Sequence, residues 1–445
     1  MSMLTTGFLT GLLLTLSVAN ASSERYHPNH LFIKMKDGQS LVKSPLIKSS
    51  KKIIPGLYLV KTTSADALAT TLQDKAAIEY VQRDFYSGKS AMPKLEPLDL
   101  NQLKMKAFTE INLNQFNDPD VSKLWAFDTT GLDVSGAYAS LPGHTPKEII
   151  VAVADTGVDH KHEDLKDVMW TNDGEIPADG KDNDGNGYID DIHGINVLVR
   201  DAQGRATMDT MASHWHGTHV SGTIAATQNN AVGIAGVASN VKIMAIRVVP
   251  DDSDELDSDI VEGFKYAAVM GAKVINCSFG KKNNEGGMVV RDVMNEIGTK
   301  YGVLVVVSAG NDSQAPFFYS NNDVDMKYPA SYDSENMLVI ASTTSSGSLS
   351  SFSNVGKVTV DVASPGSNIY STVNGGKYAM ASGTSMAAPN ASGVAAMVLG
   401  YYPELSVKEL KQVLTSTVTK VPAFTERMSS GGRLNLKRAL EVAAQ

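Results

Sequence analysis

Five short apolar runs, separated by amphipathic stretches, constrain the fold of this 445-residue chain more than any other feature. The apolar runs are EIIVAVAD at 148–155, VKIMAIRVV at 241–249, AKVINCS at 272–278, GVLVVVSAG at 302–310 and MLVIAST at 337–343. The helical stretches are HVSGTIAAT at 219–227, SDIVEGFKYAAVMG at 258–271, VVRDVMNEIGTKYG at 289–302, SMAAPNASGVAAMVLGYY at 385–402 and SVKELKQVLTSTV at 406–418. Strands that are apolar throughout and alternate with helices are typical of a mostly parallel sheet covered by helices on both faces. The sequence therefore predicts a doubly wound α/β fold over residues 116–445.

A smaller unit precedes this pattern. Between Leu31 and Tyr86 the sequence reads as strand, turn, strand, helix, strand, and Ser64 is placed to cap the helix. We interpret residues 22–92 as a small α+β domain of ferredoxin-like type. The polar stretch 93–115, which has little periodicity, is predicted to be a linker that is processed.

The first residues carry an export signature. An apolar run from Gly7 to Val18 is followed by Ala19-Asn20-Ala21, the small-x-small pattern that signal peptidases accept. No Lys or Arg precedes the run, which departs from the standard form. The alternative is a membrane anchor, but a run of about 12 residues is too short where about 20 are needed. We expect residues 1–21 to be a signal peptide, and the protein to be extracellular or periplasmic.

Charge and cysteine content exclude several classes of protein. The net charge of -9 argues against a nucleic-acid partner, because such proteins concentrate Lys and Arg on their binding surface. The single cysteine, Cys277, permits no intramolecular disulfide and lies in an apolar run, so we expect a buried core residue. No further apolar run is long enough to span a membrane. We expect the protein to be a monomer.

Three of the nine histidines, His214, His216 and His219, fall within six residues in SHWHGTHVSG. Such a cluster can begin a zinc site, because imidazole is a good zinc ligand, or it can hold one catalytic base at the start of a helix. No histidine follows His219, so a zinc site would lack further imidazole ligands downstream. The catalytic-base interpretation is favoured.

The ends of the predicted strands supply the other groups of an acyl-transfer site. Asp155 and Asn311 each follow an apolar strand, while His216 and Ser385 lie where helices begin. These residues provide a carboxylate, an amide donor, a base and a hydroxyl nucleophile. The triad order is Asp, His, Ser, and an α/β-hydrolase is excluded because it needs its His after its Ser.

These residues lie in segments that resemble the subtilisin-like serine proteases of the subtilase family. The matching segments are VAVADTGVDHKHEDL, HGTHVSGTIAA and ASGTSMAAPNASGVAAMV, with INCSFG and SAGN between them. The resemblance implies that Ser385 is the nucleophile, His216 the general base and acid, and Asp155 the carboxylate that fixes the imidazole. Asn311 would then donate to the oxyanion, and no cofactor would be needed for catalysis.

The same resemblance implies how the protein is made and used. The N-terminal unit is similar to the family's propeptide, an intramolecular chaperone and inhibitor, so the chain would be a secreted zymogen of a serine endopeptidase acting on protein or peptide substrates. A catalytically silent binding protein on the same fold is the alternative. It would have no need to keep all four catalytic residue types together.

The resemblance assigns two backbone segments to the walls of the primary specificity pocket. One wall is Ser278, Phe279 and Gly280, and the other is Ser308, Ala309 and Gly310. The small residues leave room for a medium or large side chain. The acidic run Asp251–Asp257 and Asp312 suggest a preference for basic residues in the substrate's flanking positions, against the alternative of a solvated acidic loop.

One further motif concerns a metal. The sequence DNDGNGYIDD offers Asp182, Asp184, Asn186, the Tyr188 carbonyl and Asp190 at alternate positions, much like the start of a calcium loop. His193 stands where an EF-hand has its bidentate Glu. Structural Ca²⁺ and an Asx-rich turn are the two alternatives.

Overall fold

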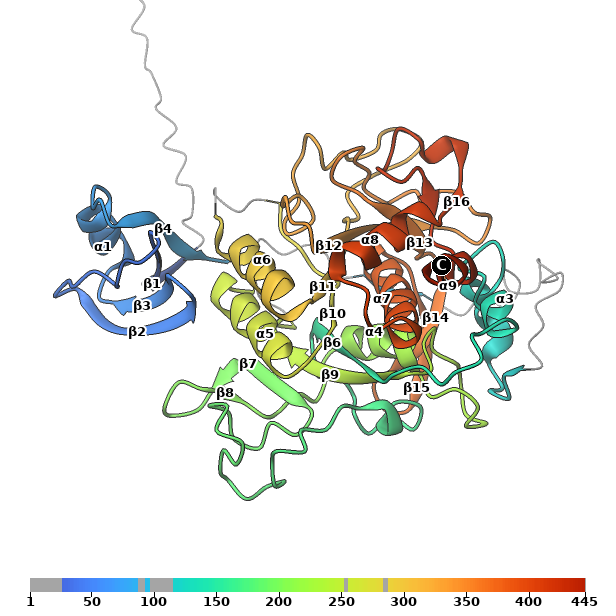
Figure 1. Ribbon diagram of the computed structural model, residues 1–445, viewed down its shortest axis with the longest axis horizontal. Coiled ribbons are helices and arrows are strands. Elements are labelled where there is room, and N and C mark those ends of the chain that lie inside the picture. Colours follow the sequence, from blue (N-terminus) through green and yellow to red (C-terminus); the bar gives the residue numbers. More distant parts are fainter. Residues whose placement is uncertain (1–25, 87–92, 97–114, 252–254, 283–286, 445) are drawn as a thin grey trace, which may run out of the picture.

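The computed structural model describes residues 26–86, 93–96, 115–251, 255–282 and 287–444. The predicted signal peptide, residues 1–21, lies outside the described residues, as does most of the predicted linker. Figure 1 shows a small N-terminal unit beside a larger α/β unit.

The N-terminal unit is a four-stranded antiparallel sheet with one helix. Its elements are β1 (Tyr26–Met35), β2 (Ile47–Ile54), β3 (Leu57–Thr62), α1 (Ala65–Leu72) and β4 (Ile78–Phe85). The strand order β2-β3-β1-β4 is that of a ferredoxin-like unit, with a loop between β1 and β2 in place of a crossover helix. Ser64 caps α1 as predicted, its Oγ accepting from the Ala67 N–H at 3.2 Å.

The two faces of this small sheet are both apolar. Leu31 and Ile33 of β1 pack with α1, whereas Phe32, between them in sequence, points the other way into the core of the larger unit. Alternation of side chains along a strand explains this division. The N-terminal unit is therefore held against the larger unit by shared hydrophobic packing.

The larger unit is built on a ten-stranded sheet of order β16-β17-β13-β12-β11-β10-β6-β9-β7-β8. The strands are β6 (Ile149–Asp155), β7 (Gly194–Arg200), β8 (Ala206–Thr207), β9 (Val241–Arg247), β10 (Val274–Cys277), β11 (Leu304–Ser308), β12 (Met337–Thr343), β13 (Val362–Pro365), β16 (Thr419–Lys420) and β17 (Gly432–Arg433). The eight neighbouring strands β17-β13-β12-β11-β10-β6-β9-β7 pair in parallel. The edge strands β8 and β16 pair antiparallel to their neighbours. All five predicted strands are present.

Helices cover both faces of this sheet, as Figure 1 shows. The helices are α3 (Val134–Tyr138), α4 (His216–Ala225), α5 (Asp257–Val269), α6 (Val289–Tyr301), α7 (Thr384–Tyr401), α8 (Val407–Ser416) and α9 (Leu436–Ala443). Val151 and Val153 of β6 face the core that contains α4 and α7, and Ala152 and Ala154 face the core that contains α5 and α6. The predicted doubly wound α/β fold is confirmed.

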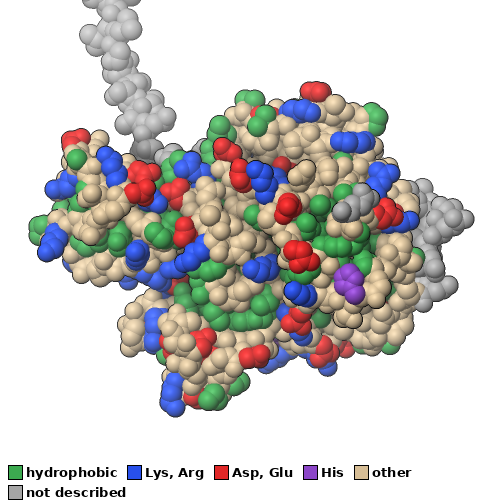
Figure 2. All heavy atoms as spheres, viewed as in Figure 1, with side chains coloured by type: hydrophobic (Ala, Val, Ile, Leu, Met, Phe, Trp, Pro, Cys, Tyr) green, Lys and Arg blue, Asp and Glu red, His purple; other side chains and the backbone are tan. Residues whose placement is uncertain are grey.

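A third, three-stranded sheet consists of β14 (Ile369–Val373), β15 (Lys377–Ala381) and β5 (Leu95–Glu96). Cys277 is fully buried in the core, as predicted, and burial raises the pKa of its thiol. In the part of the chain that the structure describes, every helix is too short or too polar to cross a lipid bilayer. Figure 2 shows one face of the molecule, on which basic and acidic side chains are intermingled.

Candidate active site

Asp155 and His216 form a buried hydrogen-bonded pair. Asp155 is the last residue of β6, in the middle of the large sheet, and His216 is the first residue of α4. The His216 Nδ1 lies 2.8 and 3.0 Å from the two Asp155 carboxylate oxygens, and both side chains are 1% exposed. A side chain at Gly217 could not be accommodated, because its Cβ would lie 2.1 Å from the Gly157 carbonyl oxygen. The pair therefore has the arrangement that fixes an imidazole tautomer with Nε2 as the proton acceptor.

Ser385 lies in the first turn of α7, which packs beside α4. Its Oγ donates to the Ser278 carbonyl at 2.9 Å, and the Ser278 Oγ donates to the Ser385 carbonyl at 3.0 Å. The His216 Nε2 is buried and has no hydrogen-bond partner among the described residues. In this structure the Ser385 hydroxyl is therefore hydrogen-bonded to a backbone carbonyl, that of Ser278, and not to His216. Transfer of its proton to His216 requires rotation of the Ser385 side chain, a change common between free and substrate-bound sites.

Asn311, three residues beyond β11, is oriented by the residue before Ser385. Its Oδ1 accepts from the Thr384 N–H at 2.8 Å and from the Thr384 Oγ1 at 3.0 Å. With the carbonyl oxygen held in this way, the Nδ2 amide is left to donate, and it lies 3.6 Å from the position of a Cβ on Gly383. A fixed amide beside the nucleophile is the geometry of an oxyanion donor. Thr384, which holds Asn311 in this orientation, directly precedes the predicted nucleophile but was not predicted from the sequence.

The histidine cluster does not converge on one point. His219 is fully buried, and its Nε2 lies 3.0 Å from the Ile369 carbonyl oxygen. Burial, and then the neighbouring His216, lower the pKa of His219 to about 3. His214 accepts from the His216 backbone N–H at 3.3 Å through its Nδ1. Because each ring has its own partner, this cluster does not have the shape of a zinc site.

The predicted pocket walls lie side by side at one edge of the sheet. Residues 278–280 follow β10, and residues 308–310 begin at the last residue of β11, which is paired in parallel with β10. The backbone rather than the side chains makes these walls: Ala309 is fully buried in the core, and Phe279 packs against the same core. A Cβ on Gly280 would lie 2.8 Å from the Tyr328 carbonyl oxygen. The functional role of these residues remains a prediction.

Three of the acidic residues in question, Asp251, Asp257 and Asp312, are paired with cations. Asp312 lies 3.0 Å from the Lys327 Nζ, and Asp257 lies 2.8 Å from the Lys281 Nζ. Asp251 lies 3.6 Å from Arg247. Residues 252–254 of the acidic run lie outside the described residues. Pairing offsets the negative field on which the predicted preference for basic substrates depends.

The predicted calcium loop does not gather its ligands as the sequence suggested. Asp182 accepts from the Gly185 and Gly187 N–H groups at 2.8 and 2.9 Å. Asp190 accepts from the backbone N–H groups of residues 179 and 180. The Tyr188 N–H donates to the Asn186 Oδ1 at 2.8 Å. The side chains of Asp182, Asn186 and Asp190 from the predicted ligand set thus stabilise turns, as Asx side chains commonly do.

Only Asp184 of that set belongs to a convergent group of carboxylates. Oxygen atoms of Glu175, Asp184 and Asp191 lie within 4.8 Å of one another. Asn186 adjoins them, and its Nδ2 lies 3.0 Å from oxygens of both aspartates. Three carboxylate oxygens at this spacing are the donor set that a hard cation such as Ca²⁺ takes. Two members of this group were not predicted from the sequence: Glu175, which precedes the motif, and Asp191, its last residue.

The chain matches the family model described as the Subtilase family over residues 146–433. It belongs to the subtilase family. This confirms the family predicted from the motifs and supports the expectation of a serine-type hydrolase. The matched region contains all four of the residues described above, Asp155, His216, Asn311 and Ser385.

Two relatives and one solved structure show how far the likeness extends. An extracellular protease of Xanthomonas campestris is 30% identical over 92% of this subtilase and 72% of that protein. Subtilisin-like protease 1 of Plasmodium berghei is 30% identical over 77% of this chain, which spans only 58% of that protein. The crystal structure of fervidolysin from Fervidobacterium pennivorans, a keratinolytic enzyme related to subtilisin, has a TM-score of 0.68 at 24% identity, covering 94% of this chain and 61% of its own. The subtilisin-like fold is thereby confirmed.

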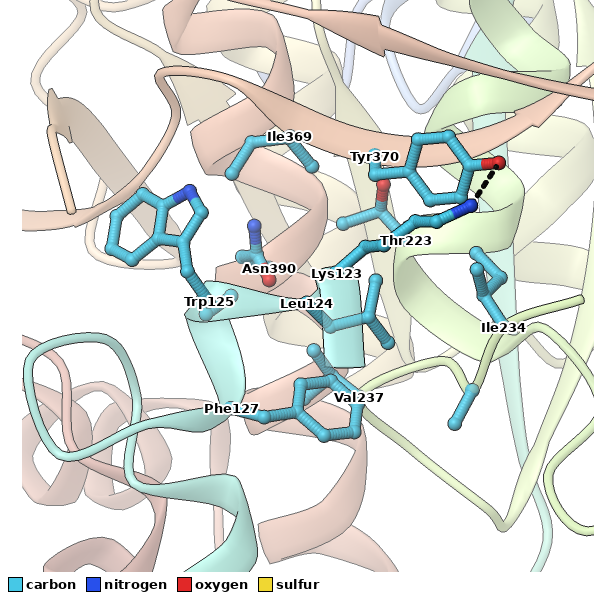
Figure 3. A pocket seen from close by; sticks show the side chains of 12 residues that line it. Lys123, Leu124, Trp125, Phe127, Thr223, Ile234, Val237, Ile369, Tyr370 and Asn390 are labelled. Carbon is cyan, nitrogen blue, oxygen red and sulfur yellow. Dashed lines mark hydrogen bonds between the residues drawn. The ribbon is translucent and has the colours of Figure 1, made fainter. Parts of the chain in front are cut away.

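A small cavity lies beside α7 of this subtilase. Figure 3 shows Asn390 of α7 facing this cavity together with Trp125 and Ile369. The Asn390 Nδ2 donates to the Pro365 carbonyl at 3.0 Å. The volume of about 20 Å³ suffices for one water molecule, so the cavity is not a substrate site.

Proposed function

We propose that this subtilase is an exported serine endopeptidase, made as a zymogen. The observation that carries the proposal is the buried Asp155–His216 hydrogen bond, which leaves the His216 Nε2 without a hydrogen-bond partner among the described residues, on a helix that packs beside α7. A base oriented in this way has no structural purpose of its own, because an unpaired buried polar atom is costly. A silent binding protein would gain nothing by keeping it.

The proposed reaction follows the roles of these residues. The Ser385 Oγ attacks the peptide carbonyl carbon while its proton passes to the His216 Nε2, and Asp155 stabilises the imidazolium. Asn311 and the Ser385 N–H donate to the oxyanion. The C–N bond then breaks as His216 returns the proton to the leaving amine. Water attacks the acyl-enzyme with His216 again as the base, which regenerates Ser385.

A fluorophosphonate probe, which labels only an activated serine, tests these roles. We expect wild-type protein to be labelled at Ser385 and to hydrolyse casein, and His216→Ala and Ser385→Ala to do neither. If His216→Ala were labelled as fast as wild type, the serine would not be activated by that histidine. If wild type were neither labelled nor active after maturation, the silent binding protein would be favoured.

The zymogen proposal rests on how β4 meets the larger unit. The Asp84 Oδ1 accepts from the Ser258 N–H at 2.9 Å, and the Gln82 Oε1 accepts from the Met288 and Val289 N–H groups at 2.6 and 3.0 Å. The N-terminal unit thus caps α5 and α6 at their N-termini, where orphan N–H groups need acceptors. Such contacts support residues 22–92 as a propeptide that templates and covers the catalytic unit.

The chain that joins the two units approaches the nucleophile. Tyr86 forms an antiparallel bridge with Leu256, and β5 pairs with β15. The Pro93 Cγ lies 3.1 Å from the position of a Cβ on Gly383, two residues before Ser385. These contacts support an inhibitory passage of the chain across the site. We propose that maturation cleaves between Tyr86 and Pro93, close to Met92.

Calcium would have a structural role only. The three convergent carboxylates of Glu175, Asp184 and Asp191 fit a hard cation, and two of these side chains are buried. We propose that they hold one Ca²⁺, which supplies positive charge to offset their mutual repulsion and ties the start of the 175–191 loop to its end. Catalysis itself needs no cofactor.

A further inference from the structure

The position of Lys327 is fixed by a backbone bridge to the first wall of the predicted specificity pocket. The Lys281 N–H donates to the Tyr328 carbonyl at 2.7 Å, and the Tyr328 N–H donates to the Lys281 carbonyl at 2.8 Å. This antiparallel pairing lays the segment that contains Lys327 alongside Gly280. Lys327 therefore lies at the pocket although it is 47 residues from Gly280 in sequence.

The aliphatic stem of Lys327 lies between the two glycine walls. Its Cδ is 2.9 Å from where a Cβ on Gly310 would be, and its Cε is 3.8 Å from where a Cβ on Gly280 would be. Only 7% of the side chain is exposed. The space that two missing side chains leave open is thus partly filled by the methylene groups of this lysine. This differs from the expectation that the small residues leave room for a large substrate side chain.

Two residues beyond the glycine walls hold the ammonium group of Lys327 in place. Its Nζ donates to the Asp312 Oδ2 at 3.0 Å, and the Asn354 Nδ2 donates to the same oxygen at 3.0 Å. Burial by itself would raise the pKa of the Asp312 carboxyl, but Lys327, Asn354 and Lys282 together hold that pKa below its usual value. The carboxylate is consequently matched by cations and is not free to attract a basic substrate side chain.

We infer that Lys327 closes the primary specificity pocket, so that the enzyme cleaves after small or slender uncharged residues and discriminates against aromatic and basic ones. This inference rests on the proposed peptidase function. An aromatic ring would have to displace a buried stem, and a basic side chain would meet a second ammonium at the same carboxylate. Differences of single methylene groups in such pockets change kcat/KM by about 10- to 200-fold. The predicted maturation segment, residues 87–92, SGKSAM, contains no aromatic residue.

Four peptides that differ only in the residue before the scissile bond, Ala, Met, Phe or Lys, test this inference. Kinetics are compared for mature wild type, Lys327→Ala, which removes stem and charge, and Lys327→Met, which keeps a slender stem and removes only the charge. Lys282→Met is the matched control, because Lys282 also contacts Asp312, at 3.3 Å, but its side chain is 71% exposed. Thermal unfolding of each variant accompanies the kinetics.

In wild type we expect kcat/KM for Ala and Met to exceed that for Phe and Lys by about tenfold or more. Lys327→Ala should raise the ratio of kcat/KM for the Phe peptide to kcat/KM for the Ala peptide by about tenfold or more, because it opens the space between Gly280 and Gly310. Lys327→Met should raise the Lys-to-Ala ratio by about tenfold, because Asp312 loses its buried partner, and leave the Phe-to-Ala ratio unchanged. The control should keep the wild-type profile.

A wild-type preference for Phe over Ala would overturn the inference, and so would a Lys327→Ala enzyme with an unchanged Phe-to-Ala ratio. If Lys327→Ala does not fold, the wild-type profile and the Lys327→Met ratios decide. Failure of wild type to cleave any of the peptides, or casein, would instead refute the proposed function. The two failures are thus distinguishable.

Discussion

Replacing Asn311 with Leu should slow the chemical step without weakening substrate binding. Leu keeps the approximate shape of the side chain but removes the Nδ2 donor, and it also removes the Oδ1 acceptor that holds Thr384 at 2.8 and 3.0 Å. A donor aimed at the oxyanion acts mainly in the transition state, because the substrate carbonyl carries less charge in the ground state.

The expected size follows from what this donor does. Loss of one oxyanion donor costs about 100- to 1,000-fold in kcat, or about 2.7–4 kcal/mol, a range that comes from subtilisin itself, a relative of this chain. The second donor, the Ser385 N–H, belongs to α7 and is retained. We therefore expect kcat to fall within that range and KM to stay unchanged.

Steady-state kinetics on a single peptide substrate measure both constants, with Thr384→Val as the comparison. Thr384→Val removes the 3.0 Å hydroxyl contact to Asn311 and the 3.0 Å hydrogen bond that the Gly310 N–H donates to the same hydroxyl. It keeps the backbone contact to Asn311, so its kcat should fall less. The reasoning would be refuted if Asn311→Leu raised KM and left kcat unchanged, because the amide would then bind the ground state. Equal losses in both variants would show that Asn311 acts through Thr384 and not through its amide.

Two further predictions concern stability. Burial lowers the pKa of His219 from its ordinary value of 6.5 to about 3 in the folded protein, so the unfolded chain takes up a proton first as the pH falls. The folded state therefore loses stability as the pH falls from about 6.5 to about 3. Denaturant unfolding measures this as the free energy of unfolding at each pH. Between these pH values the free energy of unfolding of wild type should fall more steeply than that of His219→Phe, by up to about 1.4 kcal/mol per pH unit. Parallel curves for the two proteins would contradict the argument that burial keeps His219 neutral. Removing Ca²⁺ with a chelator should lower the melting temperature of wild type, because a ligand that binds only the folded state stabilises it. The double variant Glu175→Gln/Asp191→Asn should show no such decrease. An unchanged melting temperature of wild type would contradict the proposed calcium site.

The central strands and the polar residues at their ends could be predicted because the signals are local. The runs that became β6, β9, β10, β11 and β12 are apolar throughout, as buried parallel strands require. Parallel strands end at one edge of the sheet, so Asp155 and Asn311 were expected near each other and near the helix starts of His216 and Ser385. Strand β2 was missed because IKSSKKII is mostly polar, and its exposed residues form an edge of the small sheet.

Lys327 was missed because it acts across a long sequence separation. Lys327 reaches Gly280 and Gly310 only because the chain pairs residues 281 and 328. The calcium site stays a prediction, and of the motif's predicted ligands Asp184 belongs to the convergent carboxylate group. Asp182 and Asp190 accept neighbouring backbone N–H groups, a competing use of Asx side chains that a ligand-spacing pattern does not reveal.

The most direct test of the central claim is whether the chain cleaves itself. The chain from Ser22 onward is expressed as wild type and as Ser385→Ala, and the intact mass of each is followed with time. We predict that wild type shortens to a fragment that begins between Ser87 and Pro93, whereas Ser385→Ala stays whole. If Ser385→Ala shortened at the same bond and the same rate, or if wild type stayed whole and did not hydrolyse casein, the account of Ser385 as the nucleophile of an endopeptidase would be contradicted.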